Sequence, residues 1–214
     1  MPNSNEREYR SMTLAVQQRA EGEEGADFIV NGYATTFDEP YLLWEEDDLE
    51  IWEQVSRNAF DNTDMNDVIM QYNHEGRVFA RTRNNTLTLA PDATGLMVTA
   101  DLGGTDIGRG LYQEISGGYT DKMSFGFTVD KDRREVTEEK EGKTKMLRTI
   151  EGIDKLYDVS AVSIPANPNT SIVSARFLDG AIEDIRAERL EAQKREDERK
   201  RIEIRAKALG GINK

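Results

Sequence analysis

Short segments in which large apolar residues alternate with small or polar ones recur between residues 28 and 164. The clearest is residues 123–128, Met-Ser-Phe-Gly-Phe-Thr. Successive side chains of a β-strand point to opposite faces, so this alternation directs the Met and Phe side chains toward a core. Ser124 and Gly126 then lie on the opposite face, where the missing side chain of the glycine would let a substrate backbone approach closely. The pattern predicts β-strands.

The remaining segments extend this prediction to the fold class. Residues 91–95, Pro-Asp-Ala-Thr-Gly, are typical of a turn joining two strands of a hairpin. Two helices are expected, a short one near residues 55–60 and a second over about residues 105–116. We therefore predict a mainly β fold with some α structure, an antiparallel β-barrel or sandwich with a few surrounding helices and a charged C-terminal helical tail. Other strands are expected at residues 28–34, 68–70, 86–89, 96–100 and 156–164.

Composition changes after this β-rich stretch. Residues 179–207 consist mainly of Arg, Lys, Glu and Ala, and neither Gly nor Pro interrupts them after Gly180. Acid-first pairs four residues apart, such as Glu191 with Arg195 and Glu196 with Lys200, support a solvated helix that serves for partner binding or packaging. The expected organisation is an N-terminal extension with room for one strand (1–26), a main domain (27–177) and a charged helical tail (178–214).

Charge and composition exclude several classes of function. The formal net charge is −13, and residues 21–67 contain fifteen acidic residues and one base, Arg57, so we expect no nucleic-acid partner. No apolar run is long enough to span a membrane, and the first residues do not resemble a signal peptide, so the protein should remain where it is translated. The acidic residues 45–48 lack the ligand spacing of a calcium loop and are expected to form a solvated loop.

His74 is the only histidine of the chain, and there is no cysteine. These counts exclude a zinc site of several histidines or thiolates, so neither a metal nor a cofactor is expected. A serine nucleophile needs a base that accepts its proton, and imidazole suits that task near neutral pH. His74 is therefore the candidate base for Ser124. A Ser-Lys pair with Lys122, on the same strand face, is a weaker alternative because its ammonium would need burial to act as a base.

A third residue should orient the imidazole, and Asp158 is the first candidate. It lies within the mostly apolar segment 156–164, where an unpaired acid would be costly to bury. Glu151 and Glu75 rank behind it, and Glu75 is disfavoured because neighbours on a strand point to opposite faces. A carboxylate on the exposed face of the strand is an equally open interpretation of Asp158.

In the order and spacing of several segments, the chain resembles the prohead (procapsid maturation) serine proteases of tailed bacteriophages, which are distantly related to the herpesvirus assemblins. The resemblance covers about residues 28–176 and implies an assemblin-like β fold. The segments that carry it are Gly32-Tyr33-Ala34 with Phe37, Asn58-Ala59-Phe60, Asn73-His74-Glu75, Arg81 with Thr86-Leu87, Asp92, Gly95-Leu96, residues 123–127, Val159-Ser160 and residues 165–168.

The resemblance implies a serine endopeptidase of phage head assembly. Such an enzyme is packaged inside the procapsid in the host cytoplasm, where it cleaves the scaffold protein, or the scaffold segment of the major capsid protein, and often itself. By the same resemblance His74 is the general base and Ser124 the nucleophile. Assemblins use a second histidine, which this chain lacks, so an acid such as Asp158 replaces it or a dyad suffices. Backbone amides of residues 163–170 are a hypothesis for the oxyanion donors.

Two other functions stay open at this stage. The charged tail would also suit a catalytically silent, protease-like scaffolding or assembly protein of the capsid. The same Ser-His pair could instead hydrolyse small esters. A homodimer is expected only by analogy with assemblins.

Overall fold

The computed structural model describes residues 7–13, 28–46, 48–138, 143–163 and 175–210. The chain divides into two compact units, one of residues 3–173 and one of residues 1–2 with 174–214. The first unit holds all the described strands and the helix α1, and the second holds the helix α2. The domain boundaries expected at residues 27 and 178 stay predictions.

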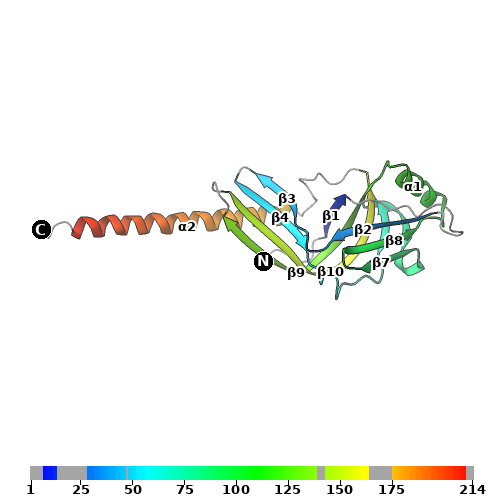
Figure 1. Cartoon of the computed structure of the whole chain (residues 1–214), viewed down its shortest axis with the longest axis horizontal. Helices are drawn as coiled ribbons and strands as arrows, with labels where there is room; N and C mark the ends of the chain where they lie inside the picture. Colours follow the sequence, from blue (N-terminus) through cyan, green and yellow to red (C-terminus); the bar gives the residue numbers. More distant parts are fainter. Residues whose placement is uncertain (1–6, 14–27, 47, 139–142, 164–174, 211–214) are drawn as a thin grey trace. The chain divides into compact units, whose positions relative to one another are not determined.

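The first unit is mainly β (Figure 1). Each strand is paired in a sheet. In chain order the elements are β1 (Glu8–Thr13), β2 (Ile29–Thr36), β3 (Tyr41–Glu46), β4 (Leu49–Val55), β5 (Ile69–Tyr72), β6 (Glu75–Arg81), the 3₁₀-helix η1 (Thr82–Asn84), β7 (Leu87–Pro91), β8 (Gly95–Asp101), α1 (Asp106–Ser116), β9 (Lys122–Glu138) and β10 (Thr144–Val162).

The strands form a seven-stranded sheet and a three-stranded sheet. The larger sheet has the order β1-β9-β10-β4-β3, and β5 joins it by pairing with β10 and β6. β9 and β10 run antiparallel along most of their length (Figure 1). Because β10 has 19 residues, it pairs in parallel with β4 along its first half and with β5 near its end. The smaller sheet, β2-β8-β7, is antiparallel.

The predicted fold class, mainly β with helices, is therefore confirmed. The sheets do not close into a barrel, and the two parallel pairs make the larger sheet mixed instead of wholly antiparallel. Period-two patterning could not reveal the parallel pairs, because it shows which face of a strand is buried and not which neighbour the strand takes.

One apolar core connects the two sheets and α1. Phe125 and Phe127 stack with ring centroids 4.6 Å apart, and Phe60 lies between Phe125 and Phe37. The strand alternation predicted the large residues of β9 on this face, and Met123, Phe125 and Phe127 are buried there. Burying a large apolar side chain stabilises a fold by roughly 1.5–3 kcal/mol, so these residues hold β9 firmly against the core.

The predicted hairpin and the longer helix are confirmed. β7 and β8 pair antiparallel, and Asp92 in the turn accepts hydrogen bonds from the amides of Thr94 (2.7 Å) and Gly95 (3.0 Å). The helix α1 begins after Thr105, whose hydroxyl caps it by accepting from the Gly108 amide at 3.1 Å. Such a cap satisfies an amide that has no partner within the helix.

The short helix expected near residues 55–60 is wrong. Val55 still belongs to β4, where it pairs with Ile150 of β10. The residues after it form consecutive turns, with the Ala59 amide donating to the Ser56 carbonyl at 2.9 Å and the Asp61 amide to the Asn58 carbonyl at 3.1 Å. Val55 therefore stays in β4, and the turns after it are held to β10, whose Ile153 amide donates to the Ala59 carbonyl at 2.9 Å.

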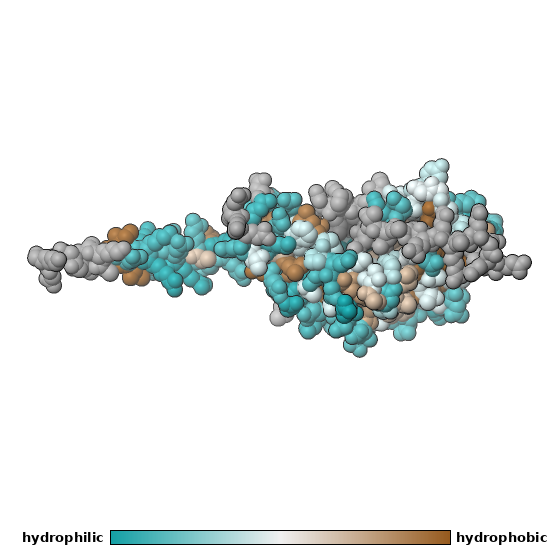
Figure 2. Space-filling model, viewed as in Figure 1, coloured by the Kyte–Doolittle hydropathy of each residue, from teal (hydrophilic) through white to brown (hydrophobic). Residues whose placement is uncertain are grey.

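The second unit contains α2 (Ala175–Gly210), 36 residues long, which confirms the charged C-terminal helix. Its described surface is mostly hydrophilic (Figure 2). The expected Glu196–Lys200 pair forms at 2.6 Å, whereas Glu191 contacts Lys194 at 3.4 Å. In the described part of the chain, no helix has both the length and the apolar character needed to cross a membrane.

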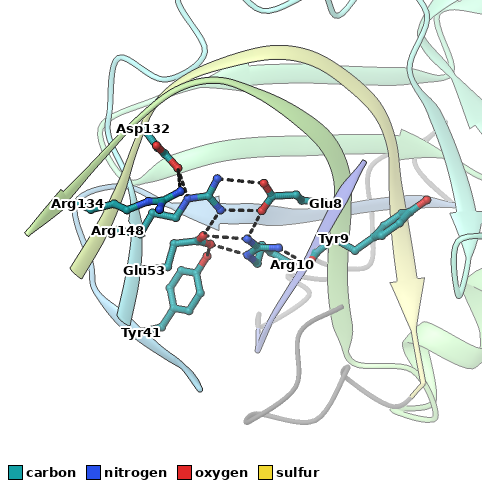
Figure 3. Close-up of polar contacts among 8 residues, drawn as sticks. All are labelled: Glu8, Tyr9, Arg10, Tyr41, Glu53, Asp132, Arg134 and Arg148. Carbon is teal, nitrogen blue, oxygen red and sulfur yellow. Dashed lines mark hydrogen bonds and ion pairs between the residues drawn. The ribbon is translucent and has the colours of Figure 1, made fainter. Parts of the chain in front are cut away.

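A buried ionic network joins β1 to the rest of the larger sheet (Figure 3). Arg10 of β1 donates to Glu53 of β4 from Nε at 2.5 Å and from Nη2 at 2.8 Å, and it also contacts Glu8. Arg148 of β10 donates from Nη1 to Glu8 at 2.7 Å and to Glu53 at 2.9 Å. Asp132 and Tyr41 complete the network by contacting Arg148 and Glu53, respectively. The acids and arginines thus share their hydrogen bonds across β1, β4 and β10.

The network shifts the pKa values of Glu53 and Arg10. Burial by itself would raise the pKa of Glu53, but the charges and hydrogen bonds of Arg10 and Arg148 outweigh burial and lower it from 4.5 to about 2. Burial likewise opposes the charge on Arg10, yet Glu53 and Glu8 raise its pKa well above the ordinary value. The charged forms are therefore the stable ones in the folded protein.

We expect this coupling to appear in the dependence of stability on pH. The pKa of Glu53 is lower in the folded chain than in the unfolded one, so ionised Glu53 stabilises the fold above about pH 4.5, and that contribution is lost as the pH falls toward about 2. Glu53→Gln should destabilise the fold by about 3–5 kcal/mol near neutral pH, because two buried arginines lose a charged partner. Urea unfolding over this pH range measures both effects.

Glu45→Gln is the matched control, since Glu45 is exposed and lies 3.6 Å from Lys143. It should change the free energy of unfolding by less than about 1 kcal/mol. The difference between the wild-type and Glu53→Gln proteins should shrink as the pH falls toward 2. A constant difference would contradict the assignment of Glu53 as the depressed group.

Candidate active site

The pairing of β9 with β10 brings two of the predicted site residues to neighbouring positions. Ser124 pairs with Ser160, and Gly126 pairs with Asp158. A register shift lies between Leu156 and Asp158, because Leu156 pairs with Phe127 of β9 and so leaves one extra residue on β10. A β-bulge of this kind turns a side chain to a new direction. Leu156 therefore packs in the core, whereas Asp158 lies on the opposite face beside Gly126.

His74 lies in the two-residue turn between β5 and β6. Asn73 and His74 both have positive φ angles, 50° and 59°, as the central residues of a tight hairpin turn require. Asn and His adopt this left-handed conformation more readily than bulkier residues, although it is still strained for any side chain. Asn73 and His74 are thus residue types that suit the left-handed conformation of this turn.

Hydrogen bonds to the end of β10 hold this turn in place. The Asn73 amide donates to the Ala161 carbonyl at 3.0 Å, and the Ser163 amide donates to Asn73 Oδ1 at 3.2 Å. The His74 amide donates to Ser160 Oγ at 3.2 Å. Because these bonds fix both turn residues to the strand that carries Asp158, the imidazole has a defined position relative to the acid.

Ser124, His74 and Asp158 form a continuous chain of short contacts. His74 Nε2 lies 2.6 Å from Ser124 Oγ, and His74 Nδ1 lies 2.5 Å from Asp158 Oδ1. The carboxylate can accept a hydrogen bond from a protonated Nδ1, which leaves the Nε2 lone pair to accept a hydrogen bond from the serine hydroxyl. Ser160 Oγ donates to the same carboxylate oxygen at 3.1 Å. This geometry permits proton transfer from the serine to the imidazole.

The site is largely buried. Ser124 has no exposed surface, and the side chains of Asp158 and His74 are 2% and 17% exposed. Little water can therefore compete for the hydrogen bonds that join the three side chains.

The structure brings together the three residues predicted from the sequence and separates the alternatives. Asp158 is buried, so the interpretation of an acid on an exposed strand face is wrong. Glu151 instead forms ion pairs with Lys131 at 2.8 Å and Arg133 at 3.1 Å, which lower its pKa. Glu75 is exposed at the start of β6. The hydroxyl of Ser124 contacts the imidazole, so the Ser-Lys alternative with Lys122 gains no support.

The predicted reason for Gly126 is wrong. A Cβ added at Gly126 would overlap Asp158 Oδ2 and lie 2.7 Å from Cε1 of Tyr9. The space above the glycine is therefore filled by the carboxylate and a tyrosine ring of the protein itself, not left for a substrate backbone. The alternation of β9 indicated the correct face, but it could not show that this face is covered as well.

Two contacts of the site were missed by the sequence analysis. Ser160 lies two residues after Asp158 on the same strand, a spacing that could have indicated a shared face. Tyr9 belongs to β1, and its ring centroid lies 4.5 Å from that of His74 at an interplanar angle of 63°. β1 has no apolar face in its sequence, because its buried residues Glu8 and Arg10 are charged, so hydrophobic patterning gave no signal for it.

Of the residues expected to supply the oxyanion donors, the structure describes Ser163. The Ser163 amide donates to Asn73, so it is already engaged. The other residues proposed, 164–170, lie outside the described residues. Among the residues that the structure describes, no group of three or more His, Cys, Asp or Glu side chains is arranged to hold a metal ion.

With this geometry established, comparison with known families decides the wider assignment. Residues 14–181 match the family model described as the caudovirus prohead serine protease. The chain belongs to that family. The match includes His74, Ser124 and Asp158 and confirms the resemblance found in the sequence, while the more distant relation to assemblins stays a prediction. No curated protein and no solved structure shows significant similarity to the chain.

The crowding above Gly126 leads to a prediction for this member of the prohead serine protease family. Gly126→Ala should destabilise the fold by about 1–3 kcal/mol, because the new methyl group must displace Asp158 or Tyr9. Urea unfolding measures the loss. Gly32→Ala is the matched control on β2, where an added Cβ would meet only Met123 Cε, at 3.5 Å.

A double variant tests the cause. In an Asp158→Ala background the closest obstacle is gone, so Gly126→Ala should cost less there than in the wild-type chain. Equal costs in the two backgrounds would show that the carboxylate does not limit the space at this glycine.

Proposed function

We propose that this chain is a serine endopeptidase that uses Ser124 as nucleophile, His74 as general base and Asp158 as the orienting acid. One observation carries the proposal: a buried serine, a partly buried imidazole and a buried carboxylate are linked by contacts of 2.6 Å and 2.5 Å in a chain of the prohead serine protease family. Geometry of this kind identifies such a triad on unrelated folds, irrespective of residue order.

The chemistry would begin with attack of Ser124 Oγ on the carbonyl carbon of the substrate. As the Oγ–C bond forms, His74 Nε2 takes the hydroxyl proton, and Asp158 stabilises the resulting imidazolium through Nδ1. His74 then gives this proton to the leaving amine when the C–N bond breaks, which leaves an acyl-enzyme on Ser124. A water molecule, deprotonated by the same imidazole, hydrolyses the ester and restores the serine.

The family supports substrates of the capsid. We propose the scaffold protein, or the scaffold segment of the major capsid protein precursor, with self-cleavage as a further reaction, inside the procapsid in the host cell. The exposed, charged surface of α2 suits a packaging or partner-binding element. The homodimer stays a prediction, which sizing of the purified protein tests.

Substitutions in the triad should abolish processing of the capsid precursor when the two proteins are coexpressed. We expect no cleavage with Ser124→Ala or His74→Ala, because the first removes the nucleophile and the second removes the group that accepts its proton. Asp158→Asn should lower the rate by about 10²–10⁴, since the amide favours the wrong tautomer of the imidazole. Ser56→Ala, in the turn after β4, is the control and should process normally. Persistent cleavage with Ser124→Ala would refute the proposed nucleophile.

A fluorophosphonate probe separates the protease from the alternatives. It should label the wild-type chain and not Ser124→Ala, because only an activated serine reacts. Labelling that persists in Ser124→Ala would refute Ser124 as the reactive serine, and no labelling at all would favour a silent scaffolding protein. Hydrolysis of model esters without cleavage of the capsid precursor would favour a small-ester hydrolase.

A further inference from the structure

The strand β1 contributes side chains both to the buried ionic network and to the candidate active site. Its residues alternate between the faces of the sheet, so Glu8 and Arg10 enter the buried ionic network while Tyr9 lies on the face of the active site. β1 precedes residues 14–181, which match the family. A strand outside that match therefore contributes a side chain to the centre of the site.

Pairing places Tyr9 in line with the catalytic acid. Tyr9 pairs with Gly126 of β9, and Gly126 pairs with Asp158 of β10, so the three residues form one row across the sheet. The glycine leaves room for the tyrosine ring and the carboxylate to approach each other above it. The imidazole of His74 then packs edge to face against the ring of Tyr9 at 4.5 Å.

Arg7 extends the contact to the second oxygen of the acid. Its guanidinium lies 3.8 Å from the centroid of the Tyr157 ring, and Nη1 lies 3.9 Å from Asp158 Oδ2. In the described part of the chain, Oδ2 is buried and receives no hydrogen bond. A nearby positive charge offsets part of the cost of that buried oxygen, although the side chain of Arg7 is 42% exposed and its charge is partly screened.

The ionic network fixes where Tyr9 lies. Arg10 holds β1 to Glu53 of β4 through two hydrogen bonds, and its Nη1 also donates to the Tyr9 carbonyl at 3.0 Å. Arg148 of β10 holds Glu8 from the other side. The backbone of Tyr9 is thus restrained on both sides of the residue, which limits the positions that its ring can take.

We propose that β1 is a working part of the active site and that Tyr9 is a positioning residue. Its ring holds the imidazole of His74 against Asp158 and shields the hydrogen bond between Nδ1 and Oδ1 from water. This inference rests on the proposed function. Because Tyr9 contacts the base, we expect its loss to slow the proton transfer and not to weaken substrate binding. Misplacing a catalytic group by about 1 Å can cost as much as 100-fold in rate.

The single histidine makes this role directly observable, because every imidazole signal in an NMR spectrum of the chain belongs to His74. The full chain is used with Ser124→Ala, which prevents self-cleavage. We expect a protected downfield signal from the Nδ1 proton in this background and with Tyr9→Phe added, since the ring remains. With Tyr9→Leu the signal should broaden or vanish through exchange with water. Tyr33→Leu, in the smaller sheet, is the matched control and should retain it.

Kinetics with the active serine test the catalytic consequence. Tyr9→Leu should lower kcat by about 10- to 100-fold with KM within about twofold, whereas Tyr9→Phe should retain most of kcat. Thermal unfolding of each variant shows whether the protein is folded at the assay temperature. A loss of kcat that merely follows the unfolded fraction would reduce Tyr9 to a structural residue and overturn the proposal.

The failures of the two proposals differ. An unchanged Nδ1 signal and unchanged kcat with Tyr9→Leu would overturn the role of Tyr9 while cleavage by the wild-type chain upholds the protease. A folded wild-type chain that cleaves nothing and does not react with fluorophosphonate would overturn the protease and the kinetic part of this inference together.

Discussion

The pairing of β9 with β10 is the constraint on which the site depends. It sets Ser124 beside Ser160 and Gly126 beside Asp158, and the bulge before Asp158 turns the acid away from the core. A slip of one residue would exchange the faces of every side chain on one strand, burying the polar residues in the core and expelling Phe125 and Phe127. The apolar core that stabilises β9 therefore also fixes the register of the face that carries Ser124.

His74 reaches that face because β10 is long enough to pair with β5 beyond the end of its pairing with β4. The hairpin of β5 and β6 then begins its turn next to Ser160, where backbone and side-chain hydrogen bonds from β10 and Ser163 offset the strain of two left-handed residues. An imidazole held on a short turn of a paired hairpin moves less than one on a long loop. His74 is thus positioned by the same strand that carries Asp158.

Much of this arrangement could be predicted from particular residues. The alternation of residues 123–128 indicated the face of Ser124, the only histidine indicated the base, and an acid in an apolar strand indicated Asp158. The bulge could not be predicted, since it depends on which residues pair across strands. Gly126 was assigned to the correct face for the wrong reason, because the sequence does not show that Tyr9 lies opposite it. Turns replaced a predicted helix after Val55, where the Ser56 amide and the Ala59 carbonyl bond to the backbone of β10 instead of within a helix.

The sequence left room for one strand in residues 1–26, but it indicated neither the bounds of β1 nor its contacts with the site. The chemistry of β1 explains both this gap and the use of the strand. A strand held by apolar residues is recognisable by its pattern, but an edge strand of that kind can slip or pair with other chains. In β1, Arg10 instead forms a directional hydrogen bond to Glu53, and Glu8 accepts one from Arg148, which attaches the strand to the rest of the sheet. A slip by one residue would leave these buried charges without partners, at a cost of several kcal/mol, and would turn Tyr9 away from His74. Buried charge is a weak source of net stability, yet it specifies one register strongly, and here that register is the one that places an aromatic ring against the base.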